Sequence, residues 1–201
     1  NTFSPGSADV WEFDGTQWVD KTPNLPKPRF WHAMAYDEAN RRTILFGGVD
    51  ALAANGDVGA DTWSWDGTRW SRIADTPGGP APRFRHAMAF DRNRGKVVLH
   101  GGGWNDANNL FVVRDDFWEL DGNTWRRITT TGPIPPGVRG HGLAFDSARS
   151  VLVLFGGIGQ IAPTSIWEFD GSSWTQRQFQ FVPSARRDFG MVYDEARART
   201  V

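Results

Sequence analysis

The sequence of 201 residues contains no cysteine, which excludes disulfides, thiolate metal sites and cysteine nucleophiles. It has no apolar run long enough to cross a membrane and no charged-then-apolar leader of the signal-peptide type. Its net charge is only −1 and its pI is near 6.5, so it lacks the basic character typical of nucleic-acid binders. We therefore expect neither membrane insertion nor nucleic-acid binding.

What the sequence does contain is repetition. The segments PRFWHAMAYDEANRRTILFGG, from Pro28, and PRFRHAMAFDRNRGKVVLHGG, from Pro82, are nearly identical, and looser copies begin at Arg139 and Arg186. A second motif alternates with this one and consists of two Trp on either side of an Asp-Gly pair. The four Asp-Gly pairs begin at residues 14, 66, 121 and 170. A period of about 50 residues indicates a repeat architecture in which neighbouring units bury one another's apolar faces.

Each repeat divides into four short predicted strands, a to d. In the first complete repeat, strand a (32–36) alternates small and large residues, and strand b (43–46) is largely apolar, as expected for a strand covered on both faces. Strands c and d flank the Asp-Gly pair, which is a strong hairpin signal. Gly47 and Gly48 permit positive φ and close backbone approach. Because helical periodicity is absent, the pattern predicts an all-β propeller of four-stranded antiparallel blades.

The chain resembles the kelch-repeat family over essentially its whole length. The resemblance rests on the Gly-Gly pairs at 47–48, 101–102 and 156–157 and on the Trp pairs around each Asp-Gly. The R-x-x-HAMA-[YF]-D segments at 29–37 and 83–91 resemble bacterial versions of the repeat in particular. This resemblance implies a propeller that binds peptides or small ligands over the mouth of its central channel.

The strand pattern gives three complete blades, at 29–73, 83–128 and 139–178, within a single domain spanning residues 1–201. Residues 10–20 contain only strands c and d, and residues 186–201 contain strand a and the start of strand b. Two interpretations stay open. Either the two end pieces complete a fourth blade and close a four-bladed ring, or the chain is part of a larger ring.

The b–c loops and the d–a loops share one face of such a propeller, and they differ most between repeats, so this face is the predicted binding surface. Trp31 stands where the other repeats have Arg85, Gly140 and Asp188, which is the variation expected at a binding site. Arginines of the d–a loops either bind carboxylates at the mouth or pair with repeat aspartates. The candidate ligand-binding residues are Arg29, Trp31, Arg83, Arg85, Trp104, Arg139, Arg187 and Asp188.

Two groups of side chains could be read as metal ligands. His32, His86 and His141 share one position in consecutive repeats, where structural hydrogen bonding is the favoured role. The b–c loops carry oxygen-bearing clusters, but neither completes a calcium-binding loop. We therefore predict no metal and no cofactor, with Asp57, Asp61 and the three histidines as the remaining candidates. The two loop clusters are Asn55, Asp57 and Asp61, and Asp106, Asp115 and Asp116.

The sequence contains no nucleophile elbow, phosphate-binding loop, zinc-protease motif or dinucleotide fingerprint. The first hypothesis is accordingly a non-catalytic module that binds a protein, peptide or glycan at the mouth. The alternative is a carbohydrate-active enzyme, mutarotase- or lyase-like, with its carboxylates in the same mouth. A third is a set of blades that supports further domains or self-associates. The chain begins with Asn1 rather than Met, typical of a processed product, and an extracellular or periplasmic location is expected.

Overall fold

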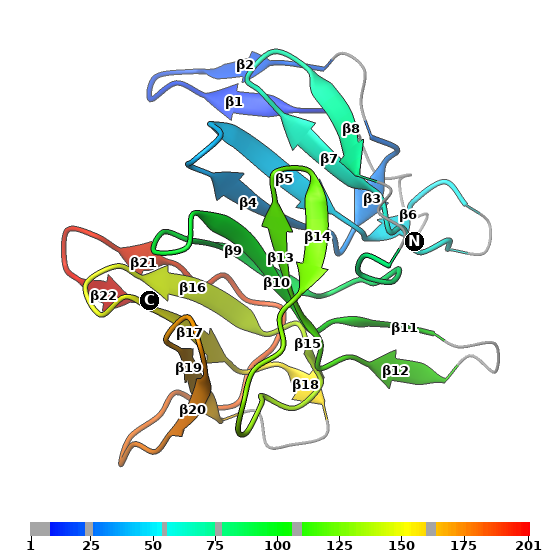
Figure 1. The fold of residues 1–201 in the computed structure, drawn as a ribbon. Helices are drawn as coiled ribbons and strands as arrows, with labels where there is room; N and C mark the ends of the chain where they lie inside the picture. Colours follow the sequence, from blue (N-terminus) through cyan, green and yellow to red (C-terminus); the bar gives the residue numbers. More distant parts are fainter. Residues whose placement is uncertain (1–8, 23–25, 54–55, 75–77, 106–109, 160–163) are drawn as a thin grey trace.

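The computed structural model describes residues 9–22, 26–53, 56–74, 78–105, 110–159 and 164–201. Within these ranges there is no helix, and so none that could cross a membrane. Three four-stranded antiparallel sheets form successive blades that follow one another down Figure 1. The prediction of an all-β protein with four-stranded antiparallel blades is confirmed. Blade one is β4 (Ala33–Asp37), β5 (Arg42–Phe46), β7 (Thr62–Trp65) and β8 (Trp70–Ala74); blade two is β9 (Ala87–Asp91), β10 (Lys96–His100), β13 (Phe117–Asp121) and β14 (Thr124–Arg127); blade three is β16 (Gly142–Asp146), β17 (Val151–Phe155), β19 (Ile166–Phe169) and β20 (Trp174–Arg177).

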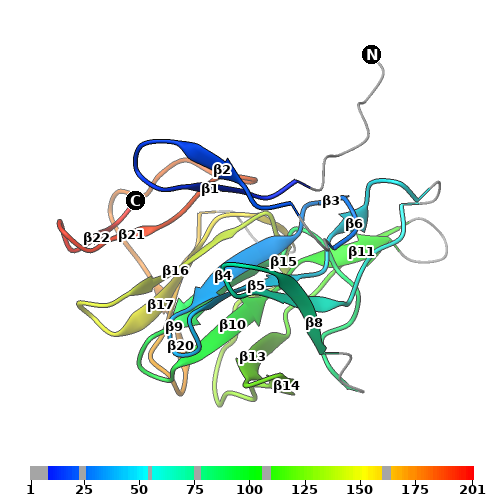
Figure 2. The same ribbon diagram turned by 90° about the horizontal axis from the view of Figure 1, so that it is seen from above.

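Two-stranded sheets flank this row of blades. β1 (Trp11–Phe13) pairs with β2 (Trp18–Asp20), and β21 (Tyr193–Asp194) pairs with β22 (Arg199–Thr200). Figure 2 shows them as two separate hairpins. Among the described strands no ladder joins them, so a fourth blade built from both ends of the chain, one of the two interpretations left open, is not observed.

Three small sheets that the sequence did not predict lie on the loop face, on the right of Figure 1. Two of them pair the residues that enter a blade with the residues just after its Gly-Gly pair, and the third folds one b–c loop into a hairpin. They extend each blade toward the predicted binding surface and give its loops a regular backbone. These strands are β3 (Arg29–Phe30) with β6 (Val49–Asp50), β15 (Val138–Arg139) with β18 (Ile158–Gly159), and β11 (Gly103–Asn105) with β12 (Phe111–Val113).

The core is distributed over the seams between blades. Ala33 and Ala35 of β4 pack against the cluster that contains Met88 of β9, and β4, β9 and β16 lie side by side. The small residues of one inner strand therefore face the large residues of the next, so the seams pack closely. Ile44 and Phe46 are fully buried in the same seam, and Leu45, which points to the opposite face, is 4% exposed in a separate cluster. This confirms that strand b is covered on both faces.

Each Gly-Gly pair is the point where one blade touches the backbone of the next. The N–H of Gly48 donates to the Arg83 carbonyl at 3.0 Å, and that of Gly102 donates to the Val138 carbonyl at 2.8 Å. Gly101, the first glycine of the same pair, has φ +67°, and a Cβ there would lie 2.5 Å from the Val138 carbonyl oxygen of the next blade. These contacts require glycine for both conformation and space.

A recurring Arg–Asp–Trp triad joins strand a to strand c inside a blade. In blade two, the guanidinium of Arg83 binds both oxygens of Asp116 at 2.6 and 2.7 Å and donates to the Gly101 carbonyl at 3.0 Å. The indole N–H of Trp118 donates to the same carboxylate at 2.7 Å. Arg29, Asp61 and Trp63 repeat this arrangement in blade one. Blade three has neither the arginine nor the aspartate: Val138 and Ser165 stand at these two positions.

The first prediction compares two glycines with positive φ. Gly101→Ala should lower the free energy of unfolding by about 3 kcal/mol or more, because the new Cβ would lie 2.5 Å from the Val138 carbonyl oxygen of the next blade. Gly95→Ala is the control, because Gly95 has φ +62° but no atom lies within 4 Å of a Cβ placed there. This substitution should cost only about 1–2 kcal/mol, the strain of a left-handed backbone with a side chain. Urea titration of both variants measures the difference. Equal losses would show that the seam does not depend on glycine.

The second prediction concerns the triad of blade two. Arg83→Val should lower stability by about 3–5 kcal/mol, because it leaves the Asp116 carboxylate buried without its cation. Blade three has Val138 and Ser165 at the two positions, so the double variant Arg83→Val/Asp116→Ser should be less destabilised than the sum of the single variants. Strict additivity in urea unfolding would contradict the coupling.

Candidate functional site

The candidate site, which we call the mouth, is built on one position of the repeat, directly before the histidine position. Trp31, Arg85, Gly140 and Asp188 occupy it in four consecutive repeats. All four have left-handed backbone, with φ of 57°, 56°, 64° and 53°. The N–H groups of Arg85, Gly140 and Asp188 each donate to the carbonyl of the residue at this position in the preceding repeat, at 2.9, 2.8 and 2.8 Å. Left-handed backbone costs a non-glycine residue about 1–2 kcal/mol, and such strain clusters at binding sites. The sequence prediction that this position is special therefore has a conformational basis.

The side chains at this position contact one another. The guanidinium carbon of Arg85 lies 4.1 Å from the centre of the Trp31 ring. Arg85 Nε lies 3.2 Å from Asp188 Oδ1, which makes an ion pair, but the two groups are not aligned for a hydrogen bond. Trp31 is 44% exposed and stacks on Phe84 with 5.3 Å between ring centres. Gly140 contributes no side chain, and the Asp188 carboxylate lies where its Cβ would be. The result is a layered Trp–Arg–Asp contact open to solvent.

The mouth carries an excess of positive charge. The guanidinium carbon of Arg139 lies 3.6 Å from the Phe111 ring centre, and Arg187 Nε lies 4.0 Å from Asp188 Oδ2. Burial, followed by the charges of Arg85 and Arg187, lowers the pKa of Arg139. Arg85 and Arg187 thus share the carboxylate of Asp188, with Arg139 as a third positive charge near them, and an added anion would relieve the repulsion among the three arginines.

Two predicted binding residues turn out to be structural. Arg83 has a fully buried side chain, so it cannot reach a ligand at the mouth. Arg29 is 10% exposed in its side chain and binds Asp61 through both of its terminal nitrogens. The pairing of these arginines with repeat aspartates, which the sequence left open, is the arrangement observed. Their role is to hold strand a to strand c.

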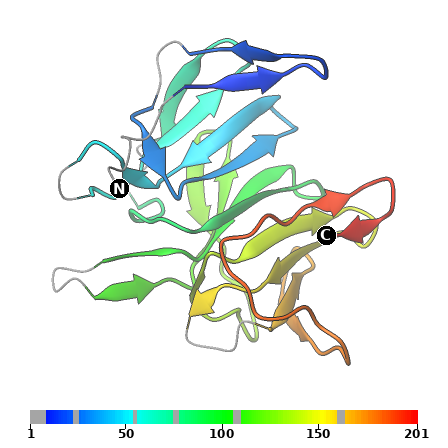
Figure 3. The same cartoon turned by 180° about the vertical axis from the view of Figure 1, so that it is seen from behind.

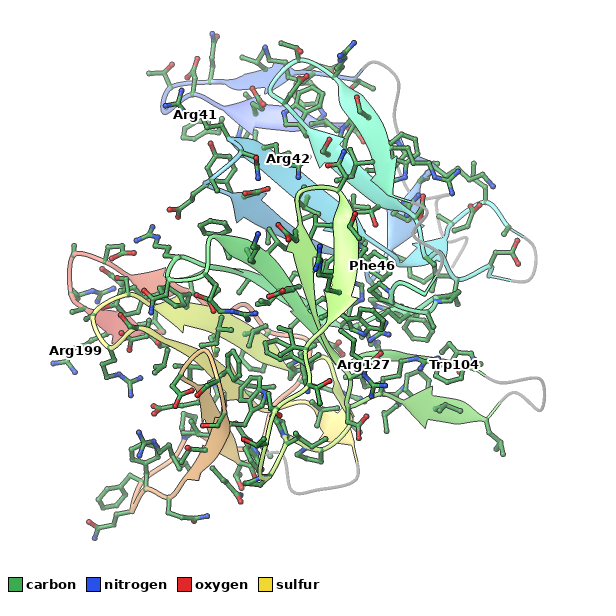
Figure 4. All side chains as sticks on the ribbon, viewed as in Figure 1. Arg41, Arg42, Phe46, Trp104, Arg127 and Arg199 are labelled. Carbon is green, nitrogen blue, oxygen red and sulfur yellow. The ribbon has the colours of Figure 1, made fainter. Side chains whose placement is uncertain are left out.

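Trp104 belongs to a different surface. It lies in β11, opposite Val112 of β12, whereas Phe111 pairs with Asn105 and so projects from the other side of the hairpin. The guanidinium carbon of Arg114 covers its ring at 4.0 Å. Figure 4 shows Trp104 beside β11, on the loop face. Trp104 is therefore outside the Trp31–Arg85–Asp188 cluster.

The candidate metal ligands do not assemble into a site. Within the described ranges, no three His, Asp or Glu side chains gather as metal ligands. Asn55 and Asp106 lie outside those ranges, and Asp61 is bound by Arg29. Asp57 lines a cavity of about 600 Å³ next to blade one. That cavity is also lined by Lys27, Asp50, Trp63 and Arg72.

His86, His100 and His141 are buried, whereas His32 is half-buried. His86 and His141 are each 6% exposed, and His100 Nδ1 lies 3.3 Å from His141 Nε2. Burial, and after it the nearby positive charge of Arg83, holds the pKa of His86 well below 6.5. Burial also lowers the pKa of His141, and lowers that of His100 to about 4, although Asp116 acts in the opposite direction on His100. These shifts favour the neutral form of the three side chains in the folded protein at neutral pH.

Sequence reasoning missed Phe84 and Phe111, which extend the mouth cluster. Their ring centres are 5.4 Å apart, and Phe84 links Phe111 to Trp31. A signal existed for Phe84, because Arg-Phe recurs at 29–30 and 83–84. Phe111 lies in a b–c loop without a counterpart in the other repeats, so no repeat signal pointed to it.

The third prediction concerns acid. Because the folded pKa of these histidines is below the unfolded value near 6.5, protonation favours the unfolded chain. The free energy of unfolding should be highest above pH 6.5 and should decrease as the pH drops toward about 4, the pKa of His100 in the folded protein. His100→Phe, which places the residue of Phe46 and Phe155 in this position, should flatten the slope of unfolding free energy between pH 6.5 and 4. An unchanged slope would show that His100 is not held neutral.

The comparisons with known proteins agree with this fold. A sequence model of the KLHDC2/KLHL20/DRC7 Kelch-repeats domain matches residues 6–198. Relatives include Mei4-dependent protein 6 of Schizosaccharomyces pombe, 26% identical over 138 residues, which are 64% of this chain and 19% of that protein. Multiple epidermal growth factor-like domains protein 8 of Mus musculus is 30% identical over 136 residues, 66% of this chain and 5% of that protein.

Serine/threonine-protein phosphatase BSL2 of Arabidopsis thaliana is 25% identical over 182 residues, 79% of this chain and 17% of that protein. The chain thus corresponds to less than a fifth of each of these relatives. The solved structure of YjhT superposes with a TM-score of 0.69 at 15% identity, over 94% of this chain and 64% of that chain, and this likeness concerns the fold alone. The chain belongs to the KLHDC2/KLHL20/DRC7 kelch-repeat family.

Proposed function

We propose that the chain is a non-catalytic binding module whose mouth takes an acidic group of a protein or peptide. The observation that carries the proposal is the charge at the mouth, where Arg85 and Arg187 share the carboxylate of Asp188 and Arg139 adds a third positive charge beside them. Guanidinium groups present a planar set of donors that matches a carboxylate. A ligand carboxylate would take the place that Asp188 only partly fills.

The aromatic residues give this site its apolar component. Trp31 is half-exposed on a floor formed by Phe84, which is itself buried. Large aromatic side chains and arginines supply most of the binding energy in protein interfaces. An acidic side chain next to an apolar one is the ligand that this combination fits.

The comparisons support a modular role. The relatives are proteins many times longer than the matched segment, as the small matched shares show. A propeller that forms a small part of a large protein is well placed to bind a partner while other parts carry other activities. The alternative, a carbohydrate-active enzyme, would use Asp188 as its acid or base. The ion pairs of Asp188 with Arg85 and Arg187 favour a positioning role for this carboxylate instead.

The fourth prediction tests the mouth with two labelled peptides of equal length, one rich in Glu and Leu and the other rich in Lys and Leu. Fluorescence anisotropy should show binding of the acidic peptide only, and added salt should weaken it. Arg85→Ala should weaken binding at least about tenfold, or about 1.4 kcal/mol. Arg126→Ala is the matched control, because Arg126 lies on the outer strand β14 with a 66% exposed side chain.

Trp31→Ala should also weaken binding while the melting temperature changes little, because the ring is 44% exposed. Equal affinity of Arg85→Ala and Arg126→Ala, or equal binding of both peptides, would contradict the proposal. Turnover of a sugar substrate that is lost in Asp188→Asn would establish the enzyme alternative.

A further inference from the structure

A cavity of about 600 Å³ lies at the loop end of blade one, beside the seam with blade two. Figure 3 shows, from behind, the β13–β14 hairpin of blade two next to blade one, and Arg42 of blade one donates to the Gly122 carbonyl of that hairpin at 2.5 Å. Small-molecule pockets have volumes of about 300–1,000 Å³. Trp31, Arg85 and Asp188 are not among the residues that line this cavity. It is therefore a second candidate site, separate from the mouth.

The size of this cavity has a cause in the sequence. Blade one has Thr62 at the strand position where blades two and three have Phe117 and Ile166. In the seam between blades two and three, the rings of Phe117 and Trp174 pack with 5.2 Å between their centres, and the cavity at the equivalent place has a volume of about 310 Å³. Because Thr62 is smaller, it leaves space beside Trp125, the counterpart of Trp174. The larger cavity is thus specific to blade one.

Thr62 also gives the cavity a polar floor. It is fully buried, and its hydroxyl oxygen accepts a hydrogen bond from the indole N–H of Trp125 at 2.9 Å. A hydroxyl group also carries one hydrogen that it can donate. In the part of the chain that the structure describes, no acceptor takes this hydrogen. Since buried donors are normally paired, an oxygen atom of a ligand in the cavity is a suitable partner.

The walls of the cavity carry both signs of charge in equal number. Lys27 Nζ lies 3.0 Å from Asp50 Oδ2, and Arg29 binds Asp61 through both of its terminal nitrogens. The carboxylate of Asp57 is exposed and has no hydrogen-bond or ion-pair partner among the described residues. Charges that cancel favour neither an anion nor a cation, whereas hydroxyl groups both donate and accept hydrogen bonds. The charged lining residues are Lys27, Arg29 and Arg72, and Asp50, Asp57 and Asp61.

Trp63 supplies an aromatic wall. Its side chain is half-buried and lines the cavity, and its indole N–H donates to Asp61 at 2.5 Å, which fixes the orientation of the ring. A sugar ring has apolar C–H groups on its faces and hydroxyl groups around its rim. The faces can stack on an indole, and the rim can bond to carboxylates and guanidinium groups. The combination of Trp63 with a charge-balanced wall therefore matches a sugar.

We propose that this cavity binds a neutral sugar of one or two rings. The Trp63 ring stacks on a C–H face of the sugar, and the Asp57 carboxylate accepts hydrogen bonds from its hydroxyl groups. The Thr62 hydroxyl donates to a sugar oxygen at the floor. Neither an acidic sugar nor an amino sugar is preferred, because the charges of the walls cancel. The site shares no residue with the Trp31–Arg85–Asp188 cluster, so it does not depend on the proposed function.

The fifth prediction is tested by saturation-transfer-difference NMR with glucose, galactose, mannose, N-acetylglucosamine, maltose and cellobiose. At least one of these sugars should receive saturation from the protein, and its titration gives the Kd. Asp57→Ala should raise this Kd at least about tenfold, because a hydrogen bond to a charged group is lost. Asp115→Ala is the matched control and should keep the Kd, because Asp115 is also exposed but lines the smaller cavity of the next seam.

Thr62→Phe should remove sugar binding, because it places in blade one the side chain that Phe117 has in blade two. Circular dichroism shows whether this variant folds, and if it does not, the comparison of the two aspartate variants decides alone. Sugar binding that persists in folded Thr62→Phe would overturn the proposal, as would equal Kd values for Asp57→Ala and Asp115→Ala.

Two further outcomes would overturn it. One is that none of the neutral sugars receives saturation. The other is that glucosamine or glucuronate, which carry a charge on a similar ring, binds more tightly than every neutral sugar. Asp57→Ala should leave the affinity for the acidic peptide unchanged, because Asp57 does not belong to the mouth. The sugar proposal and the peptide proposal therefore fail separately.

Discussion

The second glycine of each Gly-Gly pair donates its N–H to a carbonyl of the following blade, and the remaining contacts between blades are arranged around this bond. Gly48, Gly102 and Gly157 bind the carbonyls of Arg83, Val138 and Arg186 at 2.8–3.0 Å. Because the contact is between backbones, side chains on either side of it can vary without changing the angle between blades. The seams of alternating small and large residues then follow from a fixed separation of the inner strands.

The mouth is a direct consequence of this geometry. Once consecutive blades are fixed, the residue before the histidine position is held in a left-handed conformation and bonded to its counterpart in the next blade. The backbone of that residue is constant and its side chain is free to differ. In this chain the position holds Trp31, Arg85, Gly140 and Asp188. The scaffold therefore provides a ring of variable side chains on a rigid support, which is the arrangement that binding sites need.

The repeat predicted most of the fold because its signals are local. Asp-Gly turns, Gly-Gly pairs and paired Trp each imply one backbone feature, and their spacing orders those features into blades. The same reasoning singled out Trp31, Arg85 and Asp188 as candidate binding residues, since they break a repeated pattern. It could not decide that Arg83 is buried, because an arginine that recurs in a loop suits an ion pair and a ligand equally well. It also missed Phe111, which depends on the fold of a loop that has no counterpart in the other repeats.

Trp11 and Trp18 are 49% and 65% exposed, and this too could not be read from a local motif. Their sequence motif is that of a buried strand pair, but burial requires the strands that lie against them, and a motif does not specify where those strands come from. In a repeat protein, the burial of a side chain depends on the neighbouring strands and repeats as well as on its own motif.

Native-state hydrogen exchange tests the central claim most directly, namely that backbone bonds between blades define both the fold and the mouth. The amides of Gly48, Gly102 and Gly157, together with those of Arg85, Gly140 and Asp188, should be protected to nearly the same degree as the amides of the core strand β10. Exchange of these six amides at the rate of exposed loops, while β10 remains protected, would contradict the account.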